Sequence, residues 1–173
     1  MRLPPSGLGS REDLPPEVER LLLEVVADGF VYCCGNRDTP TALAASYDWE
    51  HYVDLVTIRR FDRITAARVP KRGRVDVFAP EVVVWAYEGP AACTLRALLN
   101  LVPPQHPDAP TAAYPAPPSL HIPRPEQRPM TIRLPSPGRA GVRAVRLTRL
   151  WPPDTADPRA TGTEQQRAQV MPG

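Results

Sequence analysis

Proline is distributed unevenly along this chain, and its distribution limits where helices and strands can form. Proline has no amide hydrogen to donate and a fixed φ angle, so it interrupts the interior of regular elements. Sixteen of the 24 prolines follow residue 102, whereas residues 30–102 contain four. A chain of 173 residues has the size of one domain. We therefore expect one folded domain over residues 14–150, with most regular elements before residue 103.

Two amphipathic helices are predicted before that boundary. Residues 15–28 begin with two prolines and end at Asp28-Gly29, and their apolar residues recur at intervals of three and four. Proline is tolerated in a first helical turn, and glycine commonly follows a last one. Residues 90–102 carry a second stripe of this kind, formed by Leu95, Leu98, Leu99 and Val102. Each stripe needs an apolar surface on which to pack.

The residues between the two helices are typical of β-strands. Residues 30–34, 52–59 and 63–69 are short runs rich in β-branched and aromatic residues, whereas residues 41–49 fit either an extended strand or one helical turn. The run from Glu81 to Glu88 is apolar on both faces and is expected to be the central strand. Together these patterns predict an α+β fold, a mostly antiparallel sheet with both helices packed on one face.

The remaining segments are assigned mainly from their composition. Residues 103–129 contain ten prolines, which favours extended backbone that wraps the domain, although a free linker has the same composition. Strands near residues 129–134 and 142–150 are expected to complete the domain. Residues 1–13 are interpreted as a flexible lead-in and residues 151–173 as a disordered tail.

Cysteine content and apolar runs point to a cytoplasmic protein. Three cysteines cannot form a disulfide framework, and the first residues carry no apolar segment typical of a secretory signal. No apolar run approaches the roughly 20 residues of a membrane-spanning helix. We expect no membrane association, while self-association stays open.

Charge is segregated along the chain. Residues 1–54 carry ten acidic residues and four arginines, whereas residues 59–74 and 124–149 each carry seven basic residues and one acidic residue. Residues 59–74 are expected to form a basic hairpin. The acidic N-terminal part could fold back on this hairpin; alternatively, the basic surface could attract an anionic partner. We predict a non-enzymatic binding or regulatory module that presents an arginine-rich hairpin to an acidic protein surface or a nucleic acid. The residues predicted to bind this partner are Arg59, Arg60, Arg63, Lys71, Arg72, Arg74, Arg143, Arg146 and Arg149.

A catalytic alternative uses a cysteine nucleophile. Cys33 or Cys34 could act with His51 as base and Asp54 as the orienting carboxylate, which would make the protein a small hydrolase or transferase. A thiol among Phe30, Val31 and Tyr32 is, however, more often a buried apolar residue. This alternative requires the thiol, imidazole and carboxylate to converge.

No cofactor or metal is predicted. The three histidines and three cysteines lack the spacing of zinc sites, and no glycine-rich phosphate loop occurs. Asp48, Glu50 and Asp54 would share one face of a strand and could hold a divalent cation, but we favour an exposed acidic edge paired with nearby arginines.

Overall fold

The computed structural model describes residues 14–34, 42–73, 76–127 and 131–152, and confirms the α+β fold. A six-stranded antiparallel sheet has the spatial order β6-β4-β3-β2-β1-β8. Its strands are β1 (Val31–Cys34), β2 (Leu43–Asp48), β3 (Tyr52–Arg60), β4 (Arg63–Pro70), β6 (Trp85–Gly89) and β8 (Thr131–Arg133). Residues 41–49, which were ambiguous in sequence, thus include strand β2.

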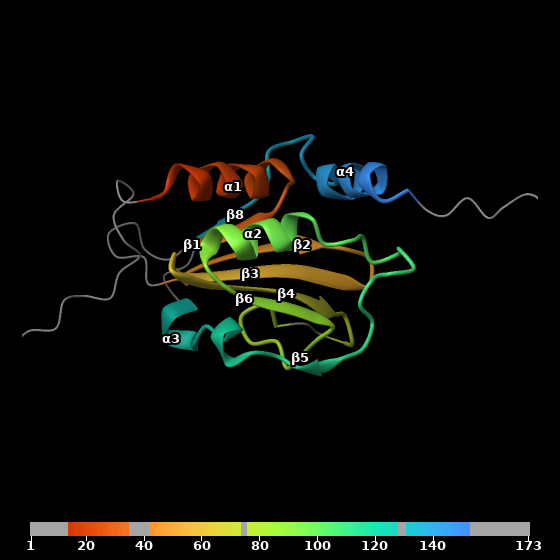
Figure 1. Ribbon diagram of the computed structural model, residues 1–173. Coiled ribbons are helices and arrows are strands. Elements are labelled where there is room, and N and C mark those ends of the chain that lie inside the picture. The colour runs from red at the N-terminus through yellow and green to blue at the C-terminus, as the bar shows by residue number, and fades with distance from the viewer. Residues whose placement is uncertain (1–13, 35–41, 74–75, 128–130, 153–173) are drawn as a thin grey trace, which may run out of the picture.

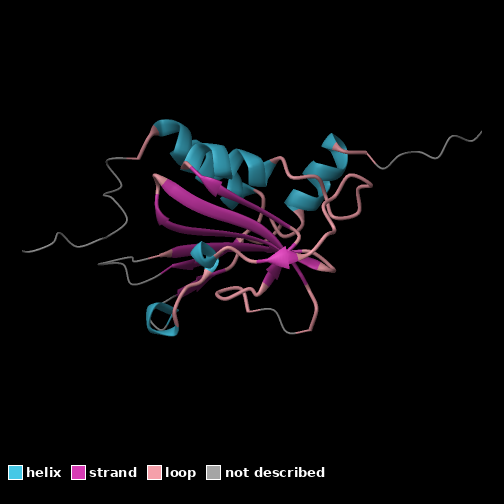
Figure 2. Ribbon diagram, turned by 60° about the horizontal axis from the view of Figure 1, so that its bottom comes forward, coloured by secondary structure: helices cyan, strands magenta, loops and turns pink. Residues whose placement is uncertain are grey.

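The helices α1 (Pro16–Ala27), α2 (Ala91–Leu99) and α4 (Val142–Leu150) lie on one side of this sheet (Figure 1, Figure 2). The α1 helix starts at a proline and is capped at its C-terminal end by Asp28, which is followed by Gly29 with a φ of 93°. A side chain at Gly29 would collide with the carbonyl oxygen of Arg139, which lies just before α4. Glycine therefore allows the end of α1 and the start of α4 to approach each other.

The proline-rich segment lies against the opposite face of the sheet. It contains the short strand β7 (Tyr114–Pro115), the 3-10 helix η2 (Pro118–Leu120) and the short helix α3 (Arg124–Gln127). Leu120 is fully buried against Val53, Leu55, Ala67 and Val69. The sheet is therefore covered on both faces, by helices on one side and by this segment on the other, as expected for a wrapping segment.

Two predictions about individual elements are wrong. Residues 81–88 do not form the central strand: β5 (Val82–Val83) pairs with β7 in a separate small sheet, and β6 is an edge strand. The apolar character of this run has another cause, because Val83 packs under the proline-rich segment. Residues 142–150 form a helix rather than a strand, starting after Gly141, whose φ is 86°.

No helix among the described residues is both long and apolar enough to cross a membrane. The predicted lead-in, residues 1–13, and most of the predicted tail lie outside the described residues.

Candidate functional site

A row of polar and aromatic side chains crosses four strands on the helix-covered face. In the register of the sheet, Asp54 on β3 is opposite Tyr47 on β2 and Arg68 on β4, and Arg68 is opposite Trp85 on β6. Asp54 and Arg68 are both fully buried. They form a two-pronged ion pair, in which Nε and Nη2 of Arg68 donate to the two carboxylate oxygens at 2.7 and 3.0 Å.

Two arginines of α4 extend this ion pair. Arg143 is also fully buried and donates to Asp54 from Nε and Nη2 at 3.1 and 2.9 Å, and to Asp28 from Nη1 at 3.1 Å. Arg146 binds both carboxylate oxygens of Asp28. We call Asp28, Asp54, Arg68, Arg143 and Arg146 the arginine network. It joins α4 to the C-terminal end of α1 and to the centre of the sheet.

Backbone carbonyls at and beyond the end of α2 receive the remaining hydrogen bonds of the network. Arg143 donates to the oxygen of Leu98, Arg146 to that of Leu99 and Arg68 to that of Val102, all at 2.7–2.8 Å. The network holds three positive and two negative charges. Carbonyls at a helix C-terminus carry partial negative charge, so they help to stabilise the excess positive charge.

The network keeps Asp54 ionised. Burial by itself raises the pKa of Asp54, but the hydrogen bond from Arg68 and the charges of Arg143 and Arg68 outweigh burial and hold the pKa below its ordinary value. Trp49 Nε1 also donates to this carboxylate, at 2.9 Å. Asp54 is thus occupied as an acceptor of structural hydrogen bonds. This arrangement fixes elements in place, and it makes Arg143 inaccessible to a partner.

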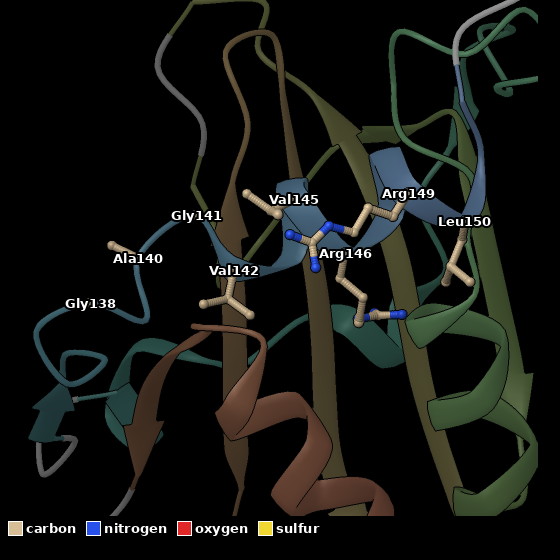
Figure 3. Close-up of a pocket in the computed structure, with 8 residues that line it drawn as sticks. All are labelled: Gly138, Ala140, Gly141, Val142, Val145, Arg146, Arg149 and Leu150. Atoms are coloured by element: carbon tan, nitrogen blue, oxygen red, sulfur yellow. The ribbon is translucent and has the colours of Figure 1, made fainter.

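The outer face of α4 carries exposed apolar side chains. Val145 and Leu150 are 54% and 57% exposed although they belong to the same helix as the fully buried Arg143. They border a hollow of about 620 Å³ (Figure 3). The hollow is lined by Gly138, Ala140, Gly141, Val142, Val145, Arg146, Arg149 and Leu150, a set without an acidic residue.

Arg149 supplies the free positive charge at this hollow. Its side chain is exposed, and within the described part of the chain it makes no ion pair or hydrogen bond. Arg146 lines the same hollow while its guanidinium stays bound to Asp28. The surface therefore combines apolar side chains with an arginine available to an anion.

The predicted basic hairpin is different, because its charges are largely neutralised. Arg59 pairs with Glu126, Arg60 with Asp62, and Arg63 with Glu88. Lys71 pairs with Asp48 at the other end of the hairpin, where Arg72 is exposed. Arg74 lies outside the described residues. The basic residues of the hairpin thus form two groups at opposite ends of β3 and β4: one at the turn between the strands, and one beyond the end of β4.

Of the catalytic alternative, the described side chains of Cys33, His51 and Asp54 do not converge. Cys33 is buried with Ala42, Ala44 and Ile122 on the face covered by the proline-rich segment, whereas Asp54 is on the helix-covered face. The side chain of His51 is 77% exposed in the turn between β2 and β3. Cys34 is part of β1, and its side chain lies outside the described set.

The acidic residues near His51 are similarly dispersed. Asp48 is exposed and pairs with Lys71, while Asp54 points into the arginine network. In the described part of the chain, no group of three or more histidine, cysteine or acidic side chains is arranged to hold a metal ion.

Sequence reasoning missed the roles of Arg68 and Asp28. The strand pairing places Asp54 opposite Arg68, but the turn at residues 61–62 does not reveal it, because Arg60 is opposite Arg63 and an irregularity between Ile58 and Arg60 then shifts the register by one residue. Two opposite charges that face each other within apolar strands indicate a buried pair. Asp28 and Arg143 carry no such signal, since 115 positions separate them.

The chain matches no protein-family model, no curated protein and no solved structure.

Proposed function

We propose that this protein is a non-enzymatic binding module that uses the outer face of α4 to bind an acidic protein partner. The observation that supports this most directly is the composition of the hollow on α4, where exposed valine and leucine surround a free arginine and no acidic side chain occurs. Exposed apolar patches bordered by charge are typical of protein interaction sites.

The apolar lining favours a protein over a nucleic acid. Binding to nucleic acid depends mainly on contacts between several basic side chains and phosphates. The hairpin arginines that could supply such contacts are engaged with carboxylates of the same chain, namely Glu126, Asp62 and Glu88. An acidic protein segment instead offers both carboxylates for Arg149 and apolar side chains for Val145 and Leu150.

The proposal is tested by fluorescence anisotropy with two labelled probes, a random copolymer of glutamate and leucine and a DNA duplex. The copolymer is expected to bind, more weakly as salt is raised. Arg149→Ala should weaken binding by roughly three- to tenfold, because one free charge contact is lost. Arg60→Ala is the matched control, since Arg60 is exposed but paired with Asp62, and should leave binding unchanged.

Three results would contradict the proposal: no binding of the copolymer, equal effects of the two variants, or binding of the duplex alone. The last result would indicate a nucleic-acid partner instead.

A further inference from the structure

The α4 helix has charged and apolar side chains on both its inner and its outer side. Its inward side chains include Arg143 and Leu147, both fully buried, and the arginine is satisfied by Asp28, Asp54 and the carbonyl oxygen of Leu98. Its outward side chains include Val145, which is more than half exposed. The buried Arg143 and the exposed Val145 are each the reverse of what a helix on a protein surface normally shows.

The outward residues have the spacing of a helix-packing surface. Those that line the hollow are at positions 142, 145, 146, 149 and 150. Steps of three or four residues along this set keep the side chains on one stripe of the helix. Such rows form the ridges and grooves by which one helix packs on another. The nine residues of α4 extend about 14 Å, so they offer the surface of two to three turns.

Space for a second helix is present beside this stripe. Gly138 and Gly141 line the hollow, and a Cβ atom built on either would meet no atom within 4 Å among the described residues. A neighbouring backbone can therefore approach α4 closely at its N-terminal end. Figure 3 shows Val142, Val145 and Arg149 projecting from α4 with no helix of the described chain over them.

We propose that the occupant of the hollow is an amphipathic acidic α-helix of the partner protein. Its apolar side chains, spaced by three and four residues, would pack on Val142, Val145 and Leu150, while a carboxylate beside them would pair with Arg149. This inference rests on the proposed function and specifies the form of the partner. Charge complementarity selects an acidic helix, because the lining carries arginines and no carboxylate.

The test compares two labelled peptides of identical glutamate and leucine content. In the patterned peptide, leucines recur every three or four residues and form one face; in the scrambled peptide they are spread around the helix. Both are used below the concentration at which they self-associate. The patterned peptide is expected to bind at least about ten times more tightly and to gain helical circular dichroism on binding.

Two substitutions locate the binding site. Val145→Asp should weaken the patterned peptide more than about tenfold, because it places a carboxylate in the apolar stripe and opposite an acidic ligand. Leu23→Asp is the matched control: Leu23 is an exposed leucine on α1 that does not line the hollow, and its substitution should have no effect. Thermal unfolding checks that both variants are folded.

The outcomes separate this inference from the proposed function. If both peptides bind equally and lose affinity with Arg149→Ala, the helical inference is wrong and the proposed function stands. The same holds if the random copolymer binds and the patterned peptide does not. If no acidic probe binds, both are wrong, and equal losses from Val145→Asp and Leu23→Asp would also overturn the helical inference.

Discussion

Asp54 illustrates how a charged residue can be stable at the centre of a sheet. Its two carboxylate oxygens accept hydrogen bonds from Trp49, Arg68 and Arg143. Transferring such charges from water is costly, and the cost is offset only where geometry and additional hydrogen bonds are good. The network meets this condition through the carbonyls at and beyond the end of α2. The network therefore favours one arrangement of the helices, because its charges can be satisfied only when α1, α2 and α4 are all in place.

Replacing Asp54 by asparagine should destabilise the protein strongly. Arg68 and Arg143 would remain buried and lose their shared countercharge, and breaking a buried pair in this way costs about 3–5 kcal/mol. The free energy of unfolding in urea measures the loss. The control is Asp62→Asn, which removes an exposed partner of Arg60 and should cost less than about 1 kcal/mol. Equal losses would show that the network contributes no special stability.

The pKa of Asp54 predicts the direction of the pH dependence of stability. Its value is lower in the folded than in the unfolded protein, so the unfolded chain binds the proton more readily as the pH falls. The stabilisation is complete above the ordinary value of about 4 and is lost as the pH drops through the lower folded value. Urea unfolding between neutral and strongly acidic pH should show this loss. Asp54→Asn should reduce the slope, and an unchanged slope would contradict the assignment.

At the level of single residues, the sequence predicts contacts that local geometry determines. The pairing of Asp54 with Arg68 belongs to a local hairpin, but it also depends on the irregularity between Ile58 and Arg60, which shifts the register by one residue. The contacts of Arg143 are not local, because they depend on how α4 packs on α1 and the sheet. Arg143 was expected on the surface because it lies in a segment rich in arginine. Its acidic partners are distant in sequence, so nothing near it indicated burial.

Among the elements, α4 shows why a helix can be mistaken for a strand. Its sequence alternates small apolar and basic residues, so neither face is purely apolar in a helix. The usual helical signal is a stripe of apolar residues directed to the core. Here the core side includes Arg143 beside Leu147, and the outer side includes Val145 beside Arg149. On the inner side, ion pairs of Arg143 therefore supplement the apolar contacts of Leu147.

The attachment of α4 should depend on Arg146 more than on Arg149, although the two are one turn apart. Arg146 binds Asp28 and the carbonyl oxygen of Leu99, whereas Arg149 has no partner within the described residues. Arg146→Ala should therefore reduce protection of the α4 amides from hydrogen exchange by roughly tenfold or more, the equivalent of one charged hydrogen-bonded contact.

Arg149→Ala provides the comparison and should leave α4 protection unchanged. Mass spectrometry of peptides that cover residues 142–150 can resolve the difference. If both variants exchange alike, the contact between Arg146 and Asp28 does not hold α4 in place.

Across the whole molecule, the antiparallel sheet and the first two helices were predictable because their periodicities are local and strong. The order of the strands was not. The apolar run at residues 81–88 resembled a central strand, yet Val83 is buried by the proline-rich segment that covers it, a contact between distant parts of the chain. Sequence periodicity reports that a face is buried without identifying what covers it.

The proline-rich segment should therefore contribute to the stability of the whole domain. Leu120 is fully buried against four sheet residues, and Ile122, also fully buried, contacts Cys33 and Ala44. Leu120→Ala should lower the free energy of unfolding by about 2–5 kcal/mol, since it removes a buried side chain and leaves a cavity. Tyr114→Ala, at a more exposed position of the same segment, should cost much less. If Leu120→Ala costs no more than Tyr114→Ala, the segment is not a structural layer, and the sheet must be stable with its second face uncovered.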